Sequence, residues 1–450
     1  MQKTTVINIV GLSSSLIGEH TPFLKKYLNG KQLLTIQPML PAVTTAVQTT
    51  YITGKWPSEN GIVGNGWYDR EECEVKFWKQ SNKLVQSESI WKKAKKENPK
   101  FTCSQMFWWY NMYSEADYSV TPRPNYVADG RKLPDCYSHP AELRDELQNK
   151  LGQFPLFQFW GPGANIKSSQ WIAEASMLID EKCNPTLTMI YLPHLDYCLQ
   201  KFGPDISIIS KELREIDAVI EKLIRFYEKK NSAIILLSEY GITPVSNPIH
   251  LNRLFREAGL LQIRTERGLE VLDVAASKAF VVADHQIAHV YINDFSVTEK
   301  VKNILKNISG IELILNKEEQ KKYNILHERS GDLVVMSDKN SWFTYYFWMD
   351  DSKAPDYARC VDIHKKPGYD PVEMFMTSKF RAGYKLLRKK LGFRYVMDVI
   401  PLNANLVKGS HGCINTSKEF YPILITDKMQ EKENINAVEV FDVIWKILDL

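Results

Sequence analysis

The sequence has no Cys-x-x-Cys pair, and its seven cysteines are scattered over 450 residues. An odd number of cysteines without close pairs argues against a disulfide framework and a zinc knuckle, so we expect reduced thiols and a cytoplasmic protein. A long hydrophobic run is also missing near the start: the apolar stretch at residues 4–12 is too short for a membrane span or for the hydrophobic part of a secretion signal. We therefore expect no membrane span.

A strong charge of one sign is missing as well. The 57 Lys and Arg residues exceed the 53 Asp and Glu residues by only four, which gives no argument for a nucleic-acid polymer as partner. The chain contains neither an internal repeat nor a low-complexity tract. Its length and its hydrophobic content of 44% fit one large α/β domain with an insertion, or two domains.

The chain does contain apolar runs that alternate with amphipathic stretches. Apolar runs at residues 6–11, Leu187–Leu192 and 232–238 predict buried strands, whereas Thr44–Thr53 and Ile206–Lys229 predict helices. Further helices are expected at residues 87–96, 139–151 and 168–179. This alternation predicts an α/β fold with a mostly parallel sheet and helices on both faces.

The pattern changes between residues 250 and 357. Strands are expected there at residues 279–283, 288–292 and 333–336, and a helix is expected at residues 297–308. We interpret residues 250–357 as an inserted α+β cap subdomain, and residues 1–249 and 358–450 as the core.

The stretch at residues 41–62 places the hydroxyl of Thr44 at a predicted helix start. A helix N-terminus offers unpaired N–H groups and a partial positive charge, which suit a phosphate or sulfate oxygen. A hydroxyl at that point can serve as a nucleophile if a base or a metal ionises it. The same stretch is also typical of a threonine-rich helix cap without chemistry.

The spacing of this stretch resembles that of the alkaline phosphatase superfamily, in its nucleotide pyrophosphatase/phosphodiesterase and phosphonoacetate hydrolase-like branch. The matching positions are Thr44, Thr53, Gly54, Pro57, Gly61, Ile62 and Asn65. The resemblance extends from Val6 to about Asn415. It implies an alkaline phosphatase-like core, a small phosphorylated substrate, Thr44 as the nucleophile and Asn65 as an amide that holds the phosphoryl group.

The resemblance also implies two metal ions bound by carboxylates and histidines, and several of those positions differ here. The matching positions are Val10, Asp196, Gln200, Glu239, Tyr240 and His411. Asp196 and His411 keep the family's residue types, and Glu239 keeps a carboxylate in place of Asp. Gln200 and Tyr240 each replace a histidine. Val10 replaces an aspartate and cannot ligate a metal, so we expect one divalent ion (Mg²⁺, Mn²⁺ or Zn²⁺) rather than two.

Other residues offer ways to rebuild the site. His194 lies two positions before Asp196, so on a strand it would share that residue's face. His364 lies in a Pro-Gly turn, and His285 and His289 are four residues apart. Each of these histidines also fits a structural or surface role. Arg123, between two prolines, is a candidate phosphate contact or an ordinary surface arginine.

Two functions follow from the resemblance. The first is a hydrolase of phosphodiester, pyrophosphate or phosphonate bonds that uses Thr44 and an altered metal site. The alternative is a catalytically inactive protein of the same fold that binds a phosphorylated ligand or a protein partner. The sequence leaves the substrate, the turnover and the oligomeric state open.

Overall fold

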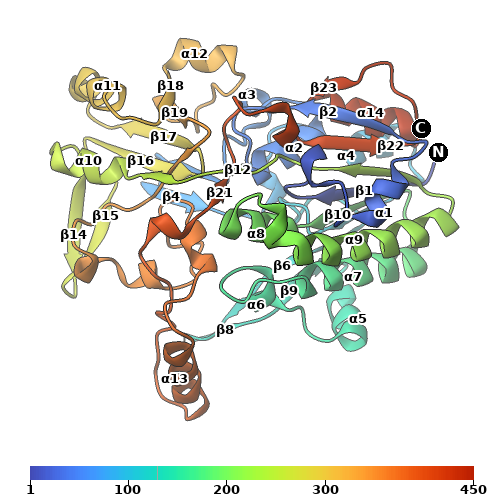
Figure 1. Ribbon diagram of the computed structural model, residues 1–450, viewed down its shortest axis with the longest axis horizontal. Coiled ribbons are helices and arrows are strands. Elements are labelled where there is room, and N and C mark those ends of the chain that lie inside the picture. Colours follow the sequence, from blue (N-terminus) through green and yellow to red (C-terminus); the bar gives the residue numbers. More distant parts are fainter. Residues whose placement is uncertain (129) are drawn as a thin grey trace.

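The computed structural model describes residues 1–128 and 130–450 of the chain. Its centre is a nine-stranded sheet in the order β23-β2-β22-β11-β1-β10-β5-β6-β9 (Figure 1). These strands are β1 (Thr4–Ile9), β2 (Gln32–Gln37), β5 (Cys103–Met106), β6 (Tyr118–Pro122), β9 (Cys136–His139), β10 (Leu187–Leu192), β11 (Ala233–Leu237), β22 (Ile423–Thr426) and β23 (Asn434–Asn436).

The middle of this sheet is parallel. β1 pairs in parallel with β10 and β11, and β5 continues the parallel order from β10 to β6. Val6 lies beside Met189 on one side and Ile235 on the other, and all three side chains are buried. Strands buried on both faces explain the continuous apolar runs in the sequence. The predicted mostly parallel α/β sheet is confirmed.

Helices cover both faces of the sheet (Figure 1). One layer contains α1 (Pro22–Tyr27), α7 (Lys167–Cys183), α8 (His194–Phe202) and α9 (Ile206–Lys229), which contact one another. On the other face, α2 (Thr44–Thr53) packs against α14 (Glu439–Leu448). The buried residues of α9 recur at helical spacing, as in Leu213, Ile216, Ile220 and Leu223, so this helix is fixed by one apolar stripe. The helices α2 and α9 and the strand β10 have the predicted bounds.

A second sheet has its own core. Its order is β16-β17-β19-β18, with β16 (Ala279–Asp284), β17 (Ile287–Ile292), β18 (Ile311–Leu315) and β19 (Leu333–Ser337). The helices α10 (Leu251–Glu257), α11 (Thr298–Lys306) and α12 (Lys317–Lys322) accompany it. Tyr68 and Phe77, from the hairpin β3 (Gly66–Asp69) and β4 (Glu74–Phe77), join this second core. The limits of the insertion at residues 250 and 357 stay a prediction.

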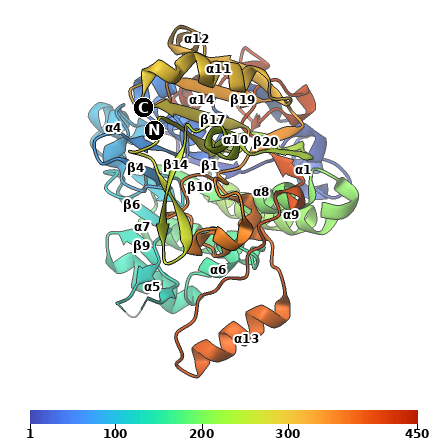
Figure 2. The same cartoon turned by 90° about the vertical axis from the view of Figure 1, so that its left-hand side faces the viewer.

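The other elements are short, with one exception. They are α3 (Pro57–Asn60), α4 (Ile90–Glu97), α5 (Glu142–Leu151), α6 (Leu156–Phe159), β7 (Asn125–Tyr126), β8 (Lys132–Leu133), β12 (Thr243–Pro244), β13 (Asn247–Ile249), β14 (Gln262–Glu266), β15 (Leu269–Asp273), β20 (Ser341–Phe343) and β21 (Gly409–Ser410). The exception is α13 (Lys379–Lys390), which projects from the rest of the molecule (Figure 2).

Two properties of the chain concern its environment. All seven cysteines carry free thiols. Within residues 1–128 and 130–450, no helix combines the length and the apolar character needed to cross a bilayer.

Candidate functional site

The candidate site lies at the carboxyl ends of the central parallel strands. Thr44 is the first residue of α2, directly after Val43, whose backbone is extended. Asp196 lies in the first turn of α8, which begins two residues after β10 ends. Glu239 and Tyr240 follow β11. Because β10 and β11 both pair with β1, their ends bring these side chains to one edge of the sheet, as expected for ligand sites in open α/β sheets.

The hydroxyl of Tyr240 joins the predicted nucleophile to the predicted metal ligand. It lies 2.8 Å from Thr44 Oγ1 and donates to Asp196 Oδ1 over 3.3 Å. A phenol has one hydrogen, so when Tyr240 donates to Asp196 it accepts from Thr44. In that arrangement the hydroxyl hydrogen of Thr44 is directed at Tyr240.

Asp196 is bonded on its second oxygen to the glutamine one turn later in α8. Gln200 Nε2 donates to Asp196 Oδ2 over 2.8 Å, and Gln200 Oε1 accepts from the Tyr369 hydroxyl over 2.9 Å. Burial raises the pKa of Asp196 to about 7. Both ends of the Gln200 amide thus have protein partners.

Glu239 is held on the opposite side of Tyr240 by two amides. Asn8 Nδ2 and Gln48 Nε2 donate to its Oε1 over 2.5 and 2.6 Å. Burial raises the pKa of Glu239 to about 8, so the protonated form is substantially populated at neutral pH. Asn8 lies on β1 and Gln48 on α2, and this bonding ties β1, α2 and β11 together at the site.

His411 lies flat against Tyr240. Their ring centroids are 3.6 Å apart and the ring planes differ by 7°. His411 Nδ1 is 2.7 Å from the Ala42 carbonyl oxygen, which can only accept, so Nδ1 carries the hydrogen. Burial lowers the pKa of His411 well below its ordinary value. Its Nε2 is then an acceptor with no hydrogen-bond partner among the described residues, and it lies 3.8 Å from Asp196 Oδ1.

Asn65 is held by a carboxylate that sequence reasoning missed. Its backbone N–H and its Nδ2 donate to Asp284 Oδ2 and Oδ1 over 2.8 and 3.0 Å, and its Oδ1 accepts from the Thr45 N–H over 3.0 Å. Burial raises the pKa of Asp284 to about 6. The role of Asn65 in holding a phosphoryl group stays a prediction. The one signal for Asp284 in the sequence is its place beside His285 at the end of the predicted strand 279–283.

The structure brings one of the alternative histidines to the site. The ring of His285 stacks on Tyr369 with centroids 3.6 Å apart, and it lies 3.8 Å from the His411 ring. Its Nδ1 contacts Asp284 Oδ1 over 2.8 Å. Both ring nitrogens of His289 have hydrogen-bond partners. Its Nε2 contacts the Val63 carbonyl over 2.9 Å, and its Nδ1 accepts from a backbone N–H.

The remaining candidates lie apart from this network. His194 would share the face of Asp196 only on a strand, and this condition is not met, because the chain turns into α8 at His194 and residues two apart on a helix point in different directions. His194 instead approaches Glu215, at 3.8 Å. His364 contacts the Phe77 carbonyl over 3.3 Å, and Arg123 donates to Gln80 Oε1 over 3.1 Å.

The donor set does not fit the two-ion centre that the resemblance implies. Among the described residues, no three His, Cys, Asp or Glu side chains are arranged so that they could hold a metal ion. Val10 is fully buried and supplies no ligand, and Tyr240 places a phenol between Thr44 and Asp196. Phenols and amides are weak ligands for zinc compared with the imidazoles they replace.

A large cavity opens onto Thr44 and Asp196. Its volume is about 1340 Å³. Aromatic side chains line much of it, namely Trp78, Trp109, Phe159, Trp160, Tyr191, Tyr197 and Tyr369. Cationic side chains also line it, namely Arg123, Arg131, Lys132, Lys365, Lys385, Arg388, Lys389 and Arg394. Rings offer stacking surfaces for a flat ligand, and the cations suit phosphate oxygens.

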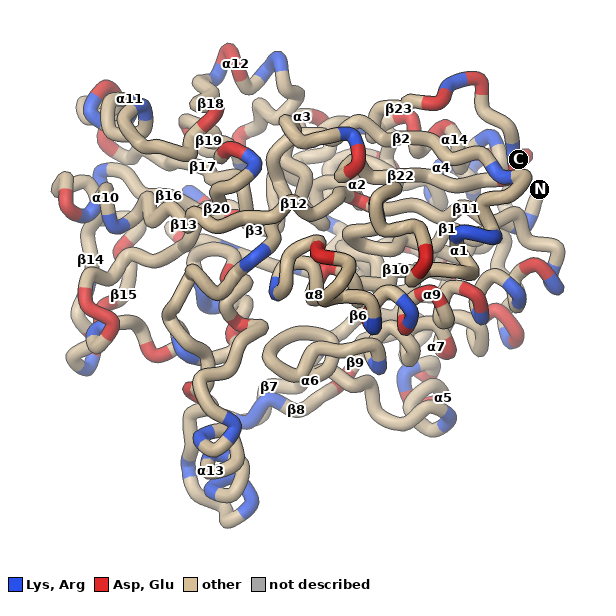
Figure 3. Tube along the Cα trace, viewed as in Figure 1, with Lys and Arg blue, Asp and Glu red and all other residues tan. Residues whose placement is uncertain are grey.

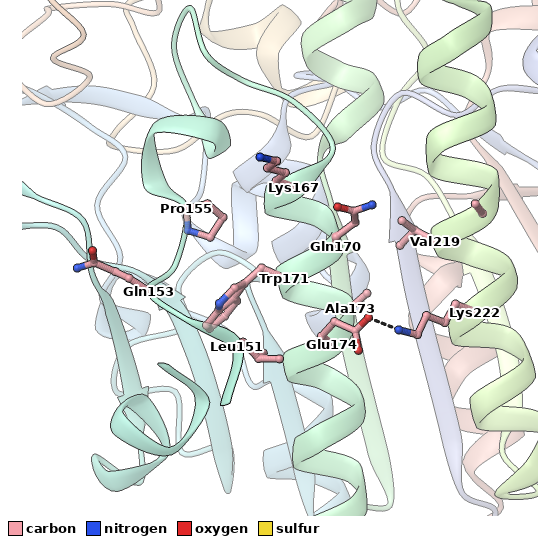
Figure 4. Close-up of a pocket in the computed structure, with 11 residues that line it drawn as sticks. Leu151, Gln153, Pro155, Lys167, Gln170, Trp171, Ala173, Glu174, Val219 and Lys222 are labelled. Carbon is pink, nitrogen blue, oxygen red and sulfur yellow. Dashed lines mark hydrogen bonds and ion pairs between the residues drawn. The ribbon is translucent and has the colours of Figure 1, made fainter. Parts of the chain in front are cut away.

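A smaller hollow of about 530 Å³ lies elsewhere, between α7 and α9 (Figure 4). Trp171 and Leu151 lie on one side of it, and an ion pair between Glu174 and Lys222 crosses from α7 to α9. None of the predicted site residues lines it. The large cavity is therefore the candidate site.

Comparison with known proteins agrees with this fold. A profile of the family "Type I phosphodiesterase / nucleotide pyrophosphatase" matches residues 4–370. The chain therefore belongs to this family of pyrophosphatases and phosphodiesterases, and the predicted membership of the alkaline phosphatase superfamily is confirmed.

Two relatives in yeasts are similar over about half of the chain. An uncharacterized pyrophosphatase/phosphodiesterase of Schizosaccharomyces pombe is 26% identical over 220 residues, which are 47% of this chain and 38% of the relative. Ectonucleotide pyrophosphatase/phosphodiesterase 2 of Saccharomyces cerevisiae is 24% identical over 267 residues, which are 54% of this chain and 48% of the relative. The matches thus span less than half the length of these relatives.

Solved structures share the whole fold. Murine ectonucleotide pyrophosphatase/phosphodiesterase 5, an inactive variant in complex with AMP, aligns with all of this chain and 96% of its own, at a TM-score of 0.61 and 14% identity. Phosphonoacetate hydrolase from Sinorhizobium meliloti 1021, in complex with phosphonoformate, aligns with 99% of this chain and 96% of its own, at a TM-score of 0.62 and 13% identity.

Proposed function

We propose that this protein binds a nucleotide-like ligand, an aromatic ring that carries phosphate, in the cavity above Thr44, and that it does so without two-metal hydrolysis. One observation carries this proposal: the Tyr240 hydroxyl contacts both Thr44 Oγ1 and Asp196 Oδ1, so a protein hydroxyl satisfies the two groups that the family's chemistry would direct at a metal.

The walls of the cavity support the ligand class. Trp78 and Trp109 have ring centroids 4.9 Å apart, and Trp160 lies 5.9 Å from Tyr369, so aromatic surface is continuous along the cavity. Aromatic side chains can stack on any flat ring, whereas Arg and Lys side chains favour a ligand whose ring carries an anionic group. The structural neighbour that was solved with AMP has the same fold, which supports a nucleoside monophosphate as the first probe.

A second candidate function is hydrolysis of a phosphodiester or pyrophosphate bond by Thr44 with one divalent ion. The observation that favours it is the unpartnered Nε2 of His411, which faces Asp196 Oδ1 at 3.8 Å. Asp196, Gln200 and His411 would hold Mg²⁺, Mn²⁺ or Zn²⁺. Such an ion would supply charge stabilisation at the attacking oxygen. Thr44 Oγ1 would form a bond to phosphorus as the bond from phosphorus to the leaving oxygen breaks and the hydroxyl proton goes to that oxygen. Water would later cleave the phosphothreonine, with Asn65 holding the phosphoryl group.

We also propose a cytoplasmic location, for which the seven free thiols are the support. The relatives include proteins named as ectonucleotide enzymes, so this placement would differ from theirs.

Two measurements on the purified chain separate the candidates. The first is calorimetric titration with AMP in the presence of a chelator. The second is hydrolysis of a nitrophenyl phosphodiester with Mg²⁺, Mn²⁺ or Zn²⁺, beside Thr44→Ala and the hydroxyl-retaining control Thr44→Ser. We expect AMP binding and no turnover above Thr44→Ala. Metal-dependent turnover that Thr44→Ser retains and Thr44→Ala loses would establish the second candidate. If the chain shows no AMP binding and no turnover, both candidate functions are contradicted.

A further inference from the structure

The helix α13 (Lys379–Lys390) has no buried residue and projects from the body of the molecule (Figures 1 and 2). We define the basic arm as residues 379–397, which comprise α13 and the chain that returns from it. Folded proteins rarely expose a contiguous apolar surface without a use for it. The chemistry of the arm's side chains therefore indicates which kind of partner it binds.

Four exposed apolar side chains form one stripe along α13 and its C-cap residue Leu391, whereas Leu386 is exposed on the opposite face. Phe380, Tyr384, Leu387 and Leu391 are spaced by three and four residues, so they lie on one face of the helix. All four are exposed, and Phe380 has 87% of its surface open to solvent. On the returning chain, Phe393 and Val396 are exposed as well.

The arm is strongly cationic. It contains seven Lys or Arg residues and no Asp or Glu; the seven are Lys379, Arg381, Lys385, Arg388, Lys389, Lys390 and Arg394 (Figure 3). Arg381 and Lys385 pair with Asp398 at the base of the arm. In the described part of the chain, no carboxylate lies within ion-pair distance of the other five. The partner must therefore be both anionic and able to bury apolar side chains.

From this placement we infer that the arm docks on an anionic lipid bilayer. A helix with an apolar stripe and Lys or Arg beside it lies in the interface of a membrane, its stripe among the acyl chains and its cations at the headgroups. Lys379 and Lys390 lie on one flank of the stripe, and Arg388, which also lines the large cavity, lies on the other. Nucleic acid would use the cations and leave the stripe in water.

The attachment of the arm favours a flat surface over a protein that wraps the helix. Both ends join the body, where the Thr377 N–H donates to the Val399 carbonyl over 2.8 Å. The opposite face of α13 lines the large cavity through Ala382, Lys385 and Leu386. One face alone is then open for docking, and the mouth of the cavity lies beside the bilayer.

The test is flotation of the full chain with lipid vesicles. The first vesicles contain equal parts of phosphatidylcholine and phosphatidylglycerol, and the second contain phosphatidylcholine alone. We expect binding to the first only, and weaker binding at high salt because salt screens the cations. Lack of binding to the anionic vesicles at low salt would overturn the inference.

Two variants separate the stripe from the charges. The triple variant Phe380→Ser, Leu387→Ser, Leu391→Ser removes the stripe and should abolish flotation. The double variant Lys379→Gln, Lys390→Gln should weaken binding roughly 25-fold, since each cation near an anionic surface contributes a factor of roughly five. None of these five residues lines the cavity.

Matched controls change similar residues elsewhere. Phe295→Ser removes an exposed aromatic, and Lys321→Gln, Lys322→Gln removes two cations from α12. Both controls should bind vesicles like the unchanged chain, and every variant should keep its thermal unfolding midpoint because α13 buries nothing. Equal losses in the controls would show that binding is a property of general charge. A dimer that the stripe variant dissociates in light scattering, without vesicle binding, would assign the arm to a second copy of the chain.

Discussion

Thr44 Oγ1 and the Tyr240 hydroxyl lie 2.8 Å apart, and the same Tyr240 hydroxyl donates to Asp196. In the family pattern an imidazole stands where this phenol stands. An imidazole offers a lone pair to a metal, whereas the phenol offers its hydrogen to a carboxylate. We propose that this phenol, together with Val10 and Gln200 at two other metal-ligand positions of the resemblance, makes the centre a hydrogen-bonded chain rather than a set of metal ligands.

The first prediction concerns this contact. Tyr240→Phe should lower the free energy of unfolding by about 1–3 kcal/mol, because it leaves a buried carboxylate oxygen and the Thr44 hydroxyl without their shared partner. Chemical denaturation measures this change. Tyr113→Phe, at an exposed tyrosine, is the control and should change stability by less than about 0.5 kcal/mol. Equal stability of the two variants would show that the contact contributes nothing.

The second prediction concerns pH. The pKa of Glu239 is raised from 4.5 to about 8, so the folded chain holds a proton that the unfolded chain has released between these values. The contribution of Glu239 to the free energy of unfolding is fully present below pH 4.5 and is lost as the pH rises towards 8. Glu239→Gln keeps the shape of the side chain without the proton equilibrium.

Comparing the two proteins isolates this effect, because all other titrating groups are shared. The unchanged chain should lose more stability than Glu239→Gln between neutral pH and about pH 8, as measured by denaturation at each pH. The buried histidines add little in this range, since their pKa values are lowered and their unfolded forms are mostly neutral. Parallel curves for the two proteins would contradict the raised pKa.

The third prediction concerns metal removal. Dialysis against a chelator should change neither the thermal unfolding midpoint nor the affinity for AMP, because the donor set does not fit a two-ion centre. His411→Ala serves as the comparison, since it removes the imidazole whose Nε2 faces Asp196. A midpoint that falls on chelation in the unchanged chain, and not in His411→Ala, would support the single-ion candidate instead.

The sequence predicted the core because its signals there are local and strong. The local sequence was sufficient to predict the first and last residues of three elements, namely Thr44–Thr53, Leu187–Leu192 and Ile206–Lys229. The resemblance grouped Asp196 and Gln200 as metal-ligand positions, and the structure joins them by a hydrogen bond one turn apart on α8. In contrast, a shared face for His194 and Asp196 required a strand, but the strand ends at Leu192 as predicted and α8 begins at His194.

Other parts of the site depend on tertiary packing, which no local pattern encodes. Asp284 comes from the second sheet and reaches Asn65 across 219 positions of sequence. His285 joins His411 only because that sheet packs against the core. The arm was missed for a different reason: its helical spacing is present in Phe380, Tyr384 and Leu387, but a helix that stays outside the core is not needed to complete the fold.

The last prediction concerns the walls of the cavity. Trp78 lines it and lies 4.9 Å from Trp109, so Trp78→Leu removes one stacking surface and leaves the predicted site residues unchanged. If AMP stacks there, its affinity should fall roughly 5- to 150-fold, because stacking of a base on an aromatic side chain contributes about 1–3 kcal/mol. Phe295→Leu, at an exposed aromatic outside the cavity, should bind AMP as before. Calorimetric titration of both variants decides the point, and unchanged affinity in Trp78→Leu would place the ring of the ligand against another part of the wall.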